Sequence, residues 1–155
     1  SRSCTDPLTK LYNRGYFDER FAEEINIAGK NSIPVSLVMM DIDFFKKIND
    51  IYGHGVGDSV LRGFARFLRV VVRESDIVAR PGGDEFVVIL PATNLDGVRL
   101  VAEKIRKELS ERRFTRKRIP VSISVGVAST SEGCDTFSCL KKRADKRMYK
   151  AKRNR

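Results

Sequence analysis

The sequence predicts an α/β domain in which a central mixed β-sheet is flanked by helices, and three observations support this fold class. The run Val35–Met40 is apolar at nearly every position, which is typical of a strand buried on both faces beneath covering helices. Helical and strand-like periodicities follow along the chain in the order helix, strand, two helices, hairpin, helix, strand, helix. The 155 residues suffice for one domain, whose core can bury roughly 70% of the surface of the unfolded chain.

The first half of the chain combines helical spacing with the buried strand. Asn13 can cap a helix whose apolar face consists of Phe17, Phe21, Ile25 and Ala28. After the strand, a short helix is expected over residues 44–51, and the Gly-His-Gly sequence at 53–55 ends it. Another helix is expected to begin near Asp58, with a core stripe formed by Leu61, Phe64, Ala65, Leu68 and Val72.

The second half begins with a predicted β-hairpin. Residues 77–79 and 86–90 are β-like, and the Pro-Gly-Gly-Asp sequence at 81–84 supplies the turn between them. Asn94 can cap the following helix, and alternating apolar residues over 119–127 predict a half-buried strand. Asp135 can cap a last helix that reaches Ala151.

The net charge of +10 is concentrated in the last third of the chain. Residues 1–100 carry 13 Lys/Arg and 14 Asp/Glu, whereas residues 101–155 carry 17 and 6. Such a balance suits a polyanion: a nucleic acid, a nucleotide triphosphate or an acidic membrane surface. A solvated helix face is the plainer interpretation. Phe114 is the one aromatic residue among the cations of 112–118, so no base-stacking platform is indicated, and we expect neither nucleic-acid binding nor membrane contact by this domain.

Cysteine usage and hydropathy indicate a cytoplasmic protein. Cys4, Cys134 and Cys139 match no zinc-binding spacing, and we expect all three to be reduced thiols. No apolar run is long enough to cross a bilayer, and no signal peptide is visible. Because the chain starts at Ser1 without an initiator Met, we expect residues 1–155 to be a single domain of a longer, multidomain signalling protein, cytoplasmic even if that protein is membrane-anchored.

Two pairs of acids are candidate ligands. Asp41 and Asp43 follow the buried strand, while Asp84 and Glu85 stand at the hairpin tip. If the hairpin pairs beside the strand, up to four carboxylates converge where ligands of open α/β sheets bind. Carboxylates without His or Cys suit Mg²⁺ or Mn²⁺, and paired Mg²⁺ suits attack at a phosphate. The alternative is that these acids only end a strand and decorate a turn. The double glycine favours a ligand, because it lets the backbone approach one closely.

The segment after Asp43 carries Lys46, Asn49 and Asp58, and the last two could read a purine edge by hydrogen bonding. The alternatives are that Asn49 is a turn residue and Asp58 a helix cap. His54, the single histidine, lies between glycines and is interpreted as structural rather than as a general base.

These residues also carry a family resemblance. Residues 82–86, Gly-Gly-Asp-Glu-Phe, resemble the signature of the GGDEF family, the bacterial diguanylate cyclases. Residues 6–14 resemble the opening D-x-L-T-x-L-x-N-R of that family, and residues 41–50 resemble its D-I-D-x-F-K-x-I-N-D. Residues 143–152 resemble its closing R-A-D-x-x-x-Y-x-A-K, so the similarity covers essentially the whole chain.

The resemblance implies a palm-like nucleotide-cyclase fold and the condensation of two GTP into cyclic di-GMP across a homodimer with facing sites. It implies that Asp41, Asp84 and the Ile42 carbonyl hold two Mg²⁺ (or Mn²⁺) per GTP site. Glu85 would be a metal ligand or the group that deprotonates the 3′-hydroxyl. The nucleotide contacts implied are Gly82 and Gly83 along the nucleotide, Asn49 and Asp58 at guanine, and Lys46, Lys152 and the backbone amides near Phe44 and Phe45 at the phosphates.

A second site is implied by Arg73 and Asp76, which form R-x-x-D at the family's offset from Gly82. This spacing resembles the family's inhibitory site for cyclic di-GMP, and Lys104 is the candidate third contact by position. A surface ion pair is the alternative interpretation.

The chain departs from the family pattern at several positions, and Lys10 and Gly15 in the opening motif are expected to have little effect. Pro81 precedes the glycines where the family often has a bulky residue, and Arg155 ends the chain before the usual last phosphate-binding arginine. The competing functional hypothesis is a catalytically silent domain that binds GTP or cyclic di-GMP as a receptor. A nucleic-acid-binding domain is a third hypothesis, which rests on the basic last third and predicts salt-sensitive binding.

Overall fold

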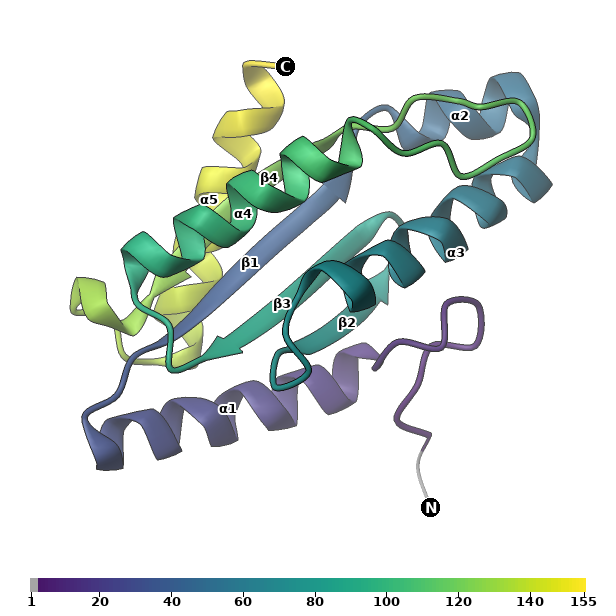
Figure 1. The fold of residues 1–155 in the computed structure, drawn as a ribbon. Coiled ribbons are helices and arrows are strands. Elements are labelled where there is room, and N and C mark those ends of the chain that lie inside the picture. The colour runs from purple at the N-terminus through teal and green to yellow at the C-terminus, as the bar shows by residue number, and fades with distance from the viewer. Residues whose placement is uncertain (1–2) are drawn as a thin grey trace.

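The computed structural model describes residues 3–155; residues 1 and 2 of the expected domain lie outside the described part. Figure 1 shows a sheet with helices on both of its faces. The elements, in chain order, are α1 (Arg14–Asn31), β1 (Val35–Ile42), α2 (Phe45–Tyr52), α3 (His54–Val71), β2 (Ile77–Gly82), β3 (Glu85–Pro91), α4 (Leu95–Leu109), β4 (Ile123–Ser129), the 3₁₀ turn η1 (Thr130–Glu132) and α5 (Phe137–Arg153).

The four strands form one sheet in the order β2-β3-β1-β4. The predicted α/β class, the central position of the Val35–Met40 strand and the hairpin that carries the glycine turn are confirmed. The strand pairings are all antiparallel, so the sheet is mixed only through an isolated parallel bridge between Tyr12 and Ala79. β1 and β2 run in the same direction, but β3 lies between them, so they do not pair with each other. This is why the sheet contains no parallel pair of strands among the described residues.

Two apolar clusters lie on opposite faces of the sheet. Val38 and Met40 of β1 pack with α3 and α4, while Leu37 and Met39 pack with α1 and α5. Because β1 is covered on both sides, all eight of its residues are buried, which explains its nearly continuous apolar sequence. Among the described residues, no helix is long and apolar enough to span a membrane.

Three element boundaries differ from the sequence-based expectation. α3 begins at His54 rather than near Asp58, because the chain turns at Gly53, with φ +92°, and resumes a helix at once. β4 begins at Ile123, since the segment before it buries Ile119 without joining the sheet. The last helix is capped by Thr136, not Asp135: its side chain accepts a hydrogen bond of 3.1 Å from the Cys139 N–H.

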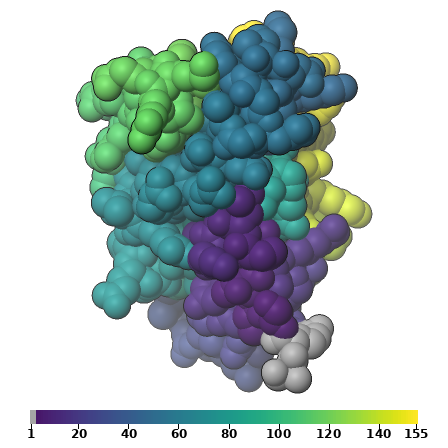
Figure 2. Space-filling model, turned by 90° about the vertical axis from the view of Figure 1, so that its right-hand side faces the viewer, coloured from purple at the N-terminus to yellow at the C-terminus, as the bar shows by residue number. Residues whose placement is uncertain are grey.

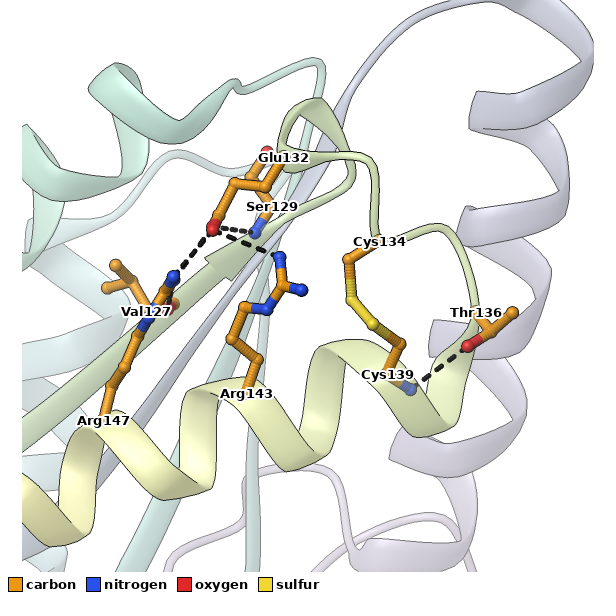
Figure 3. The surroundings of a disulfide bond; sticks show 8 residues. All are labelled: Val127, Ser129, Glu132, Cys134, Thr136, Cys139, Arg143 and Arg147. Atoms are coloured by element: carbon orange, nitrogen blue, oxygen red, sulfur yellow. Dashed lines mark hydrogen bonds and ion pairs between the residues drawn. A yellow bond between two sulfur atoms is a disulfide. The ribbon is translucent and has the colours of Figure 1, made fainter.

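The start of α5 also corrects the cysteine expectation. Cys134 and Cys139 form a disulfide (Figure 3), whereas Cys4 is not disulfide-bonded. Spacing alone gave no sign of this bridge, which joins the loop after η1 to the first turn of α5. Glu132 adds ion pairs to Arg143 (3.3 Å) and Arg147 (2.7 Å), so α5 is tied to η1 at several points between its first turn and Arg147.

α5 lies against β4 because Gly126 has no side chain. A Cβ atom at this position would lie 1.9 Å from the Ala144 carbonyl oxygen and 2.3 Å from the Met148 nitrogen, both of them α5 backbone atoms. Backbone atoms of a helix cannot move aside as a flexible side chain can. Gly126 therefore sets the distance between the sheet and the helix that carries Lys152.

We expect Gly126→Ala to lower the free energy of unfolding by about 3 kcal/mol or more, because α5 must move away from β4. Thermal unfolding measures this, with an expected fall of about 6 °C or more. The matched control is Gly29→Ala in α1, where a Cβ atom meets nothing within 4 Å. It should stabilise the protein by up to about 1 kcal/mol. Equal Tm values for the two variants would contradict this account of the packing.

Candidate functional site

The candidate site lies where β1 ends beside the β2–β3 turn. Antiparallel pairing places Asp41 opposite Glu85, and the main-chain N–H of Ile42 donates to the carbonyl oxygen of Asp84 at 3.2 Å. Figure 1 shows the end of β1 and this turn at the same end of the sheet, next to α2. The hairpin thus pairs beside β1, which is the condition under which the acids could converge.

Asp41 is buried and only partly neutralised. One of its oxygens, Oδ2, forms an ion pair with the ammonium of Lys152, which reaches it from α5. The other oxygen, Oδ1, is buried and has no hydrogen-bond partner among the described residues. A buried carboxylate oxygen without a donor is costly, so this atom marks a place where a cation or a donor would be stabilising.

Asp84 and Glu85 add further negative charge. Burial, reinforced by the charge of Asp41, raises the pKa of the Asp84 carboxyl. Burial also raises the pKa of Glu85, with contributions from Asp41 and Asp145. The pKa of Lys152 is raised: burial opposes its charge, but the hydrogen bond and charge of Asp41 outweigh that effect. The site therefore favours positive charge beyond that of Lys152.

Asp43 does not join this group. Its carboxylate accepts hydrogen bonds from the hydroxyls of Ser122 (2.8 Å) and Ser124 (2.6 Å) and from Arg155 (3.2 Å). The convergence of four carboxylates considered in the sequence analysis is therefore reduced to three. Asp43 instead fastens the end of β1 to β4 and to the last residue of the chain.

An open cavity of about 480 Å³ adjoins Glu85 between α1, the hairpin and α5. Its lining includes Arg14 and Asp18 from α1, Gly82 from the turn, and Lys141 from α5. Both signs of charge thus border the space that Glu85 faces.

Arg80 braces the glycine turn, and the sequence analysis missed it. Its guanidinium donates two hydrogen bonds to the carbonyl oxygen of Gly83, at 2.9 and 2.7 Å. It also pairs with Asp6 at 3.0 Å, and Asp6 accepts hydrogen bonds from the Thr9 N–H (2.9 Å) and hydroxyl (2.7 Å). The signal available in the sequence was an arginine three residues before the second glycine of the turn, Gly83, which the structure shows at φ +54°. The N-terminal segment thereby helps to fix the turn that precedes Asp84.

The candidate guanine-reading residues meet at the corner between α2 and α3. A Cβ atom at Gly57 would lie 1.8 Å from Asn49 Oδ1, so the glycine makes room for the Asn49 side chain. This oxygen is buried and has no hydrogen-bond partner within residues 3–155. Asp58, half-buried, follows Gly57 directly. The unpartnered Asn49 oxygen suits a ligand that donates hydrogen bonds, and so does a carboxylate such as that of Asp58.

The remaining candidate phosphate contacts surround the start of α2. Phe44 has a left-handed backbone (φ +56°) and is 53% exposed, with the Arg155 guanidinium 4.0 Å from its ring centroid. Phe45 begins the helix and is half-buried, and Lys46 is exposed. The backbone thus changes direction sharply between the end of β1 and the first turn of α2.

The candidate inhibitory residues lie elsewhere, near the end of α3. Arg73 pairs with the buried carboxylate of Asp76 at 2.8 Å and also donates to the Pro91 carbonyl and the Thr93 hydroxyl, both at 2.9 Å. The ammonium of Lys104 donates to the carbonyl of Val71, the residue two positions before Arg73, at 3.5 Å. The Arg73–Asp76 ion pair exists, yet the Arg73 side chain remains 53% exposed and accessible.

The residues at the end of β1 fit a divalent cation of the Mg²⁺ type. Within the described residues, no three His, Cys, Asp or Glu side chains form a ready-made metal cluster. Mg²⁺ does not need one, because it is commonly held by one or two carboxylates together with water and substrate phosphates. The unpartnered Oδ1 of Asp41 and the raised pKa values of Asp84 and Glu85 are the observations that make the fit.

Comparison with protein families and curated proteins gives consistent matches. Residues 3–155 match the family described as "Diguanylate cyclase, GGDEF domain". The response regulator PleD of Caulobacter vibrioides is 46% identical over 154 residues, which cover 97% of this chain and 34% of PleD. Diguanylate cyclase A of Treponema denticola is 40% identical over 157 residues, which cover 98% of this chain and 42% of that protein. The chain thus spans less than half the length of these two relatives.

Solved structures show the same similarity. The GGDEF domain of DgcB from Caulobacter crescentus, determined in complex with c-di-GMP, superposes with a TM-score of 0.91 at 33% identity. The match covers 99% of this chain and 92% of the DgcB domain.

We expect Asp84→Asn to raise Tm by about 2 °C at pH 7 in metal-free buffer. The pKa of Asp84 is raised, so the folded state binds its proton more tightly than the unfolded state does. The charged carboxylate therefore lowers stability as pH rises through the raised pKa, and the amide removes this cost.

The difference from the wild type should vanish as pH falls below about 4, where the carboxyl is protonated in both states. Thermal unfolding between pH 3 and 8 measures it, with the exposed Asp135→Asn as control. A variant that is less stable than the wild type at pH 7 would show that the Asp84 charge is compensated.

Proposed function

Because the chain belongs to the GGDEF diguanylate cyclase family, we propose that it condenses two GTP molecules into cyclic di-GMP and two pyrophosphates. The observation that carries the proposal is the group of Asp41, Asp84 and Glu85, brought together by the β1–β3 register with one carboxylate oxygen unpartnered. Such a group of carboxylates suits a metal-bound triphosphate, because the glycine turn beside it lets a nucleotide come close to the backbone.

In the proposed reaction the 3′-hydroxyl oxygen of one GTP attacks the α-phosphorus of the other. A P–O bond forms, the bond from that phosphorus to the pyrophosphate breaks, and the hydroxyl proton leaves. Glu85 is the proposed acceptor of this proton or, alternatively, a metal ligand, and its raised pKa makes proton uptake easier. In the second step the 3′-hydroxyl of the other nucleotide attacks the α-phosphorus of the first, which closes the ring and releases the second pyrophosphate. Both nucleotides must therefore be held face to face, which we propose a homodimer with two facing sites achieves.

Asp41 and Asp84, with the carbonyl of Ile42, are the proposed holders of two divalent cations per site. Bound there, the cations would offset the negative charge that develops on the departing pyrophosphate. Lys152 forms an ion pair with Asp41. The ammonium of Lys152, together with Lys46 and the backbone amides near Phe44 and Phe45, would contact the phosphates of the bound nucleotide.

Guanine selectivity is assigned to Asn49 and Asp58. The Asp58 carboxylate can accept hydrogen bonds from N1–H and N2–H₂ of guanine, groups that adenine does not present in this arrangement. Asn49 supplies the unpartnered Oδ1 beside it. GTP is therefore the proposed substrate and ATP is excluded by its base edge.

We further propose that the domain acts in the cytoplasm as the catalytic part of a longer signalling protein, like relatives of which it spans less than half. Its sensory input would come from outside the residues described.

We expect the protein with GTP and Mg²⁺ to form cyclic di-GMP and pyrophosphate, and ATP to give no cyclic product. Chromatography measures both products, and their rate should rise faster than linearly with protein concentration because the reaction needs a dimer. Asp84→Ala should lower the rate about a thousandfold or more, while Asp135→Ala should leave it unchanged.

Retention of full activity by Asp84→Ala would refute the metal-site assignment. Absence of product, even from protein forced to dimerise by a fused coiled coil, would favour the alternative of a silent GTP or cyclic di-GMP receptor. Equilibrium binding of both nucleotides distinguishes that outcome from an unfolded protein.

Product inhibition is proposed to act through Arg73, Asp76 and Lys104. The exposed guanidinium of Arg73 can bind phosphate or a guanine edge bidentately, and the Lys104 ammonium is held at the carbonyl of Val71, two residues before Arg73. We expect Arg73→Ala to raise the concentration of cyclic di-GMP needed for half inhibition at least about tenfold. The initial rate without added cyclic di-GMP should fall by a much smaller factor. Arg99→Ala, an exposed α4 arginine outside this group, is the control. An unchanged inhibition curve for Arg73→Ala would remove the assignment.

A further inference from the structure

The loop between α4 and β4 lies against α3 and is held there by apolar contacts. Phe114 packs over Gly63, where a Cβ atom would lie 2.6 Å from the Phe114 side chain, and its ring centroid is 6.3 Å from that of Phe67. The Arg112 guanidinium lies 5.5 Å from the centroid of the Phe67 ring. The absence of a side chain at residue 63 is what allows Phe114 to come this close. The loop is therefore fixed to the helix rather than extended into solvent.

This contact gathers positive charge on one face. We call it the basic face and define it by exposed side chains of α3 and the loop: Arg62, Arg66, Arg113, Arg116, Lys117 and Arg118. Arg62 and Arg66 are one helical turn apart and directly precede Gly63 and Phe67, the residues on which the loop packs. Figure 2 shows the loop (green) beside α3 (blue to teal) on a single side of the molecule.

The cations of the basic face are not neutralised within the protein. In the described part of the chain, none of the six forms an ion pair with an acidic side chain, and Arg113 donates only to loop carbonyls. Glu111 is the one acid in the loop segment 111–118. Like charges held together repel, and Phe114 keeps them together. A surface of this kind becomes stable when an anionic partner covers it.

The character of the face favours a lipid bilayer over a nucleic acid. Phe114 faces inward on Gly63 and Phe67, so the loop offers no exposed ring on which a base could stack. Val70, one turn beyond Arg66, is 79% exposed. An apolar side chain in line with arginines suits the headgroup region, where cations meet phosphate and apolar groups reach the acyl boundary.

Docking at this face would leave the candidate catalytic acids accessible. α3 covers one face of the sheet, whereas Lys152 and the cavity beside Glu85 lie with α5 on the other. We propose that the basic face docks the domain onto an anionic phospholipid surface. This goes beyond the proposed cyclase function, does not depend on it, and departs from the expectation from the sequence that the domain makes no membrane contact.

The test is sedimentation of the wild-type protein with vesicles of phosphatidylcholine alone and of phosphatidylcholine mixed with phosphatidylglycerol. We expect binding to the mixed vesicles only, and its loss in high salt. Each basic residue near an anionic bilayer contributes roughly fivefold to partitioning. The triple variant Arg116→Gln/Lys117→Gln/Arg118→Gln should therefore bind roughly a hundredfold more weakly.

The matched control removes the same number of charges from exposed positions on α1 and α5: Lys30→Gln/Lys146→Gln/Lys150→Gln. It should retain most of the vesicle binding, although both variants have the same net charge. A second variant, Arg62→Gln/Arg66→Gln, tests the helix part of the face without altering the loop. Circular dichroism of each variant verifies that it is folded.

Equal loss in the loop and control variants would overturn the proposal, because net charge rather than this face would then explain binding. Failure of the wild-type protein to bind mixed vesicles would also overturn it. Tighter binding to duplex nucleic acid than to mixed vesicles, at the same salt and lost in the loop variant, would assign the face to nucleic acid instead. Vesicle binding lost in both the loop and the α3 variants, and retained in the control, supports the proposal.

Discussion

The register of β1 is the constraint on which the rest of the site depends. Its pairing with β3 sets Asp41 opposite Glu85, and its pairing with β4 sets Asp41 opposite Ser124. A slip of one residue would turn every side chain of β1 to the other face of the sheet. Leu37 and Met39 would then exchange clusters with Val38 and Met40, so the two apolar cores oppose the slip. The position of the Asp41 carboxylate, a candidate metal ligand, is thus held by hydrophobic packing several residues away.

Electrostatics at the end of β1 work against stability. Burial and mutual repulsion raise the pKa values of Asp84 and Glu85, and Asp41 retains a buried oxygen that has no partner within residues 3–155. Lys152 relieves part of this cost, while Ser122, Ser124 and Arg155 bind Asp43 and remove it from the group. Uncompensated negative charge in an otherwise well-packed domain is what a site for cations and phosphates requires.

At three glycines a neighbouring part of the chain lies closer than any side chain would allow, and the contact has a different role at each. Gly126 lets α5 reach β4 and so positions Lys152, and Gly57 makes room for Asn49. Gly63 lets Phe114 fix the basic loop on α3. In each case the neighbouring element is distant in sequence or belongs to another helix, so the need for glycine is visible only in the fold.

The sequence by itself determined the α/β class, the order of elements and the hairpin, because periodicity and turn residues are local properties. It also placed acids at the ends of β1 and of the turn. Only the tertiary structure decided which acids meet: Asp43 is bound by Ser122 and by Ser124 of β4, and Arg80 pairs with Asp6 of the N-terminal segment while it holds the Gly83 carbonyl of the turn. The Cys134–Cys139 bridge, the all-antiparallel pairing of the strands and the clustering of cations on α3 likewise depend on contacts between separate elements. Such contacts are selected by packing, which residue spacing along a single chain does not encode.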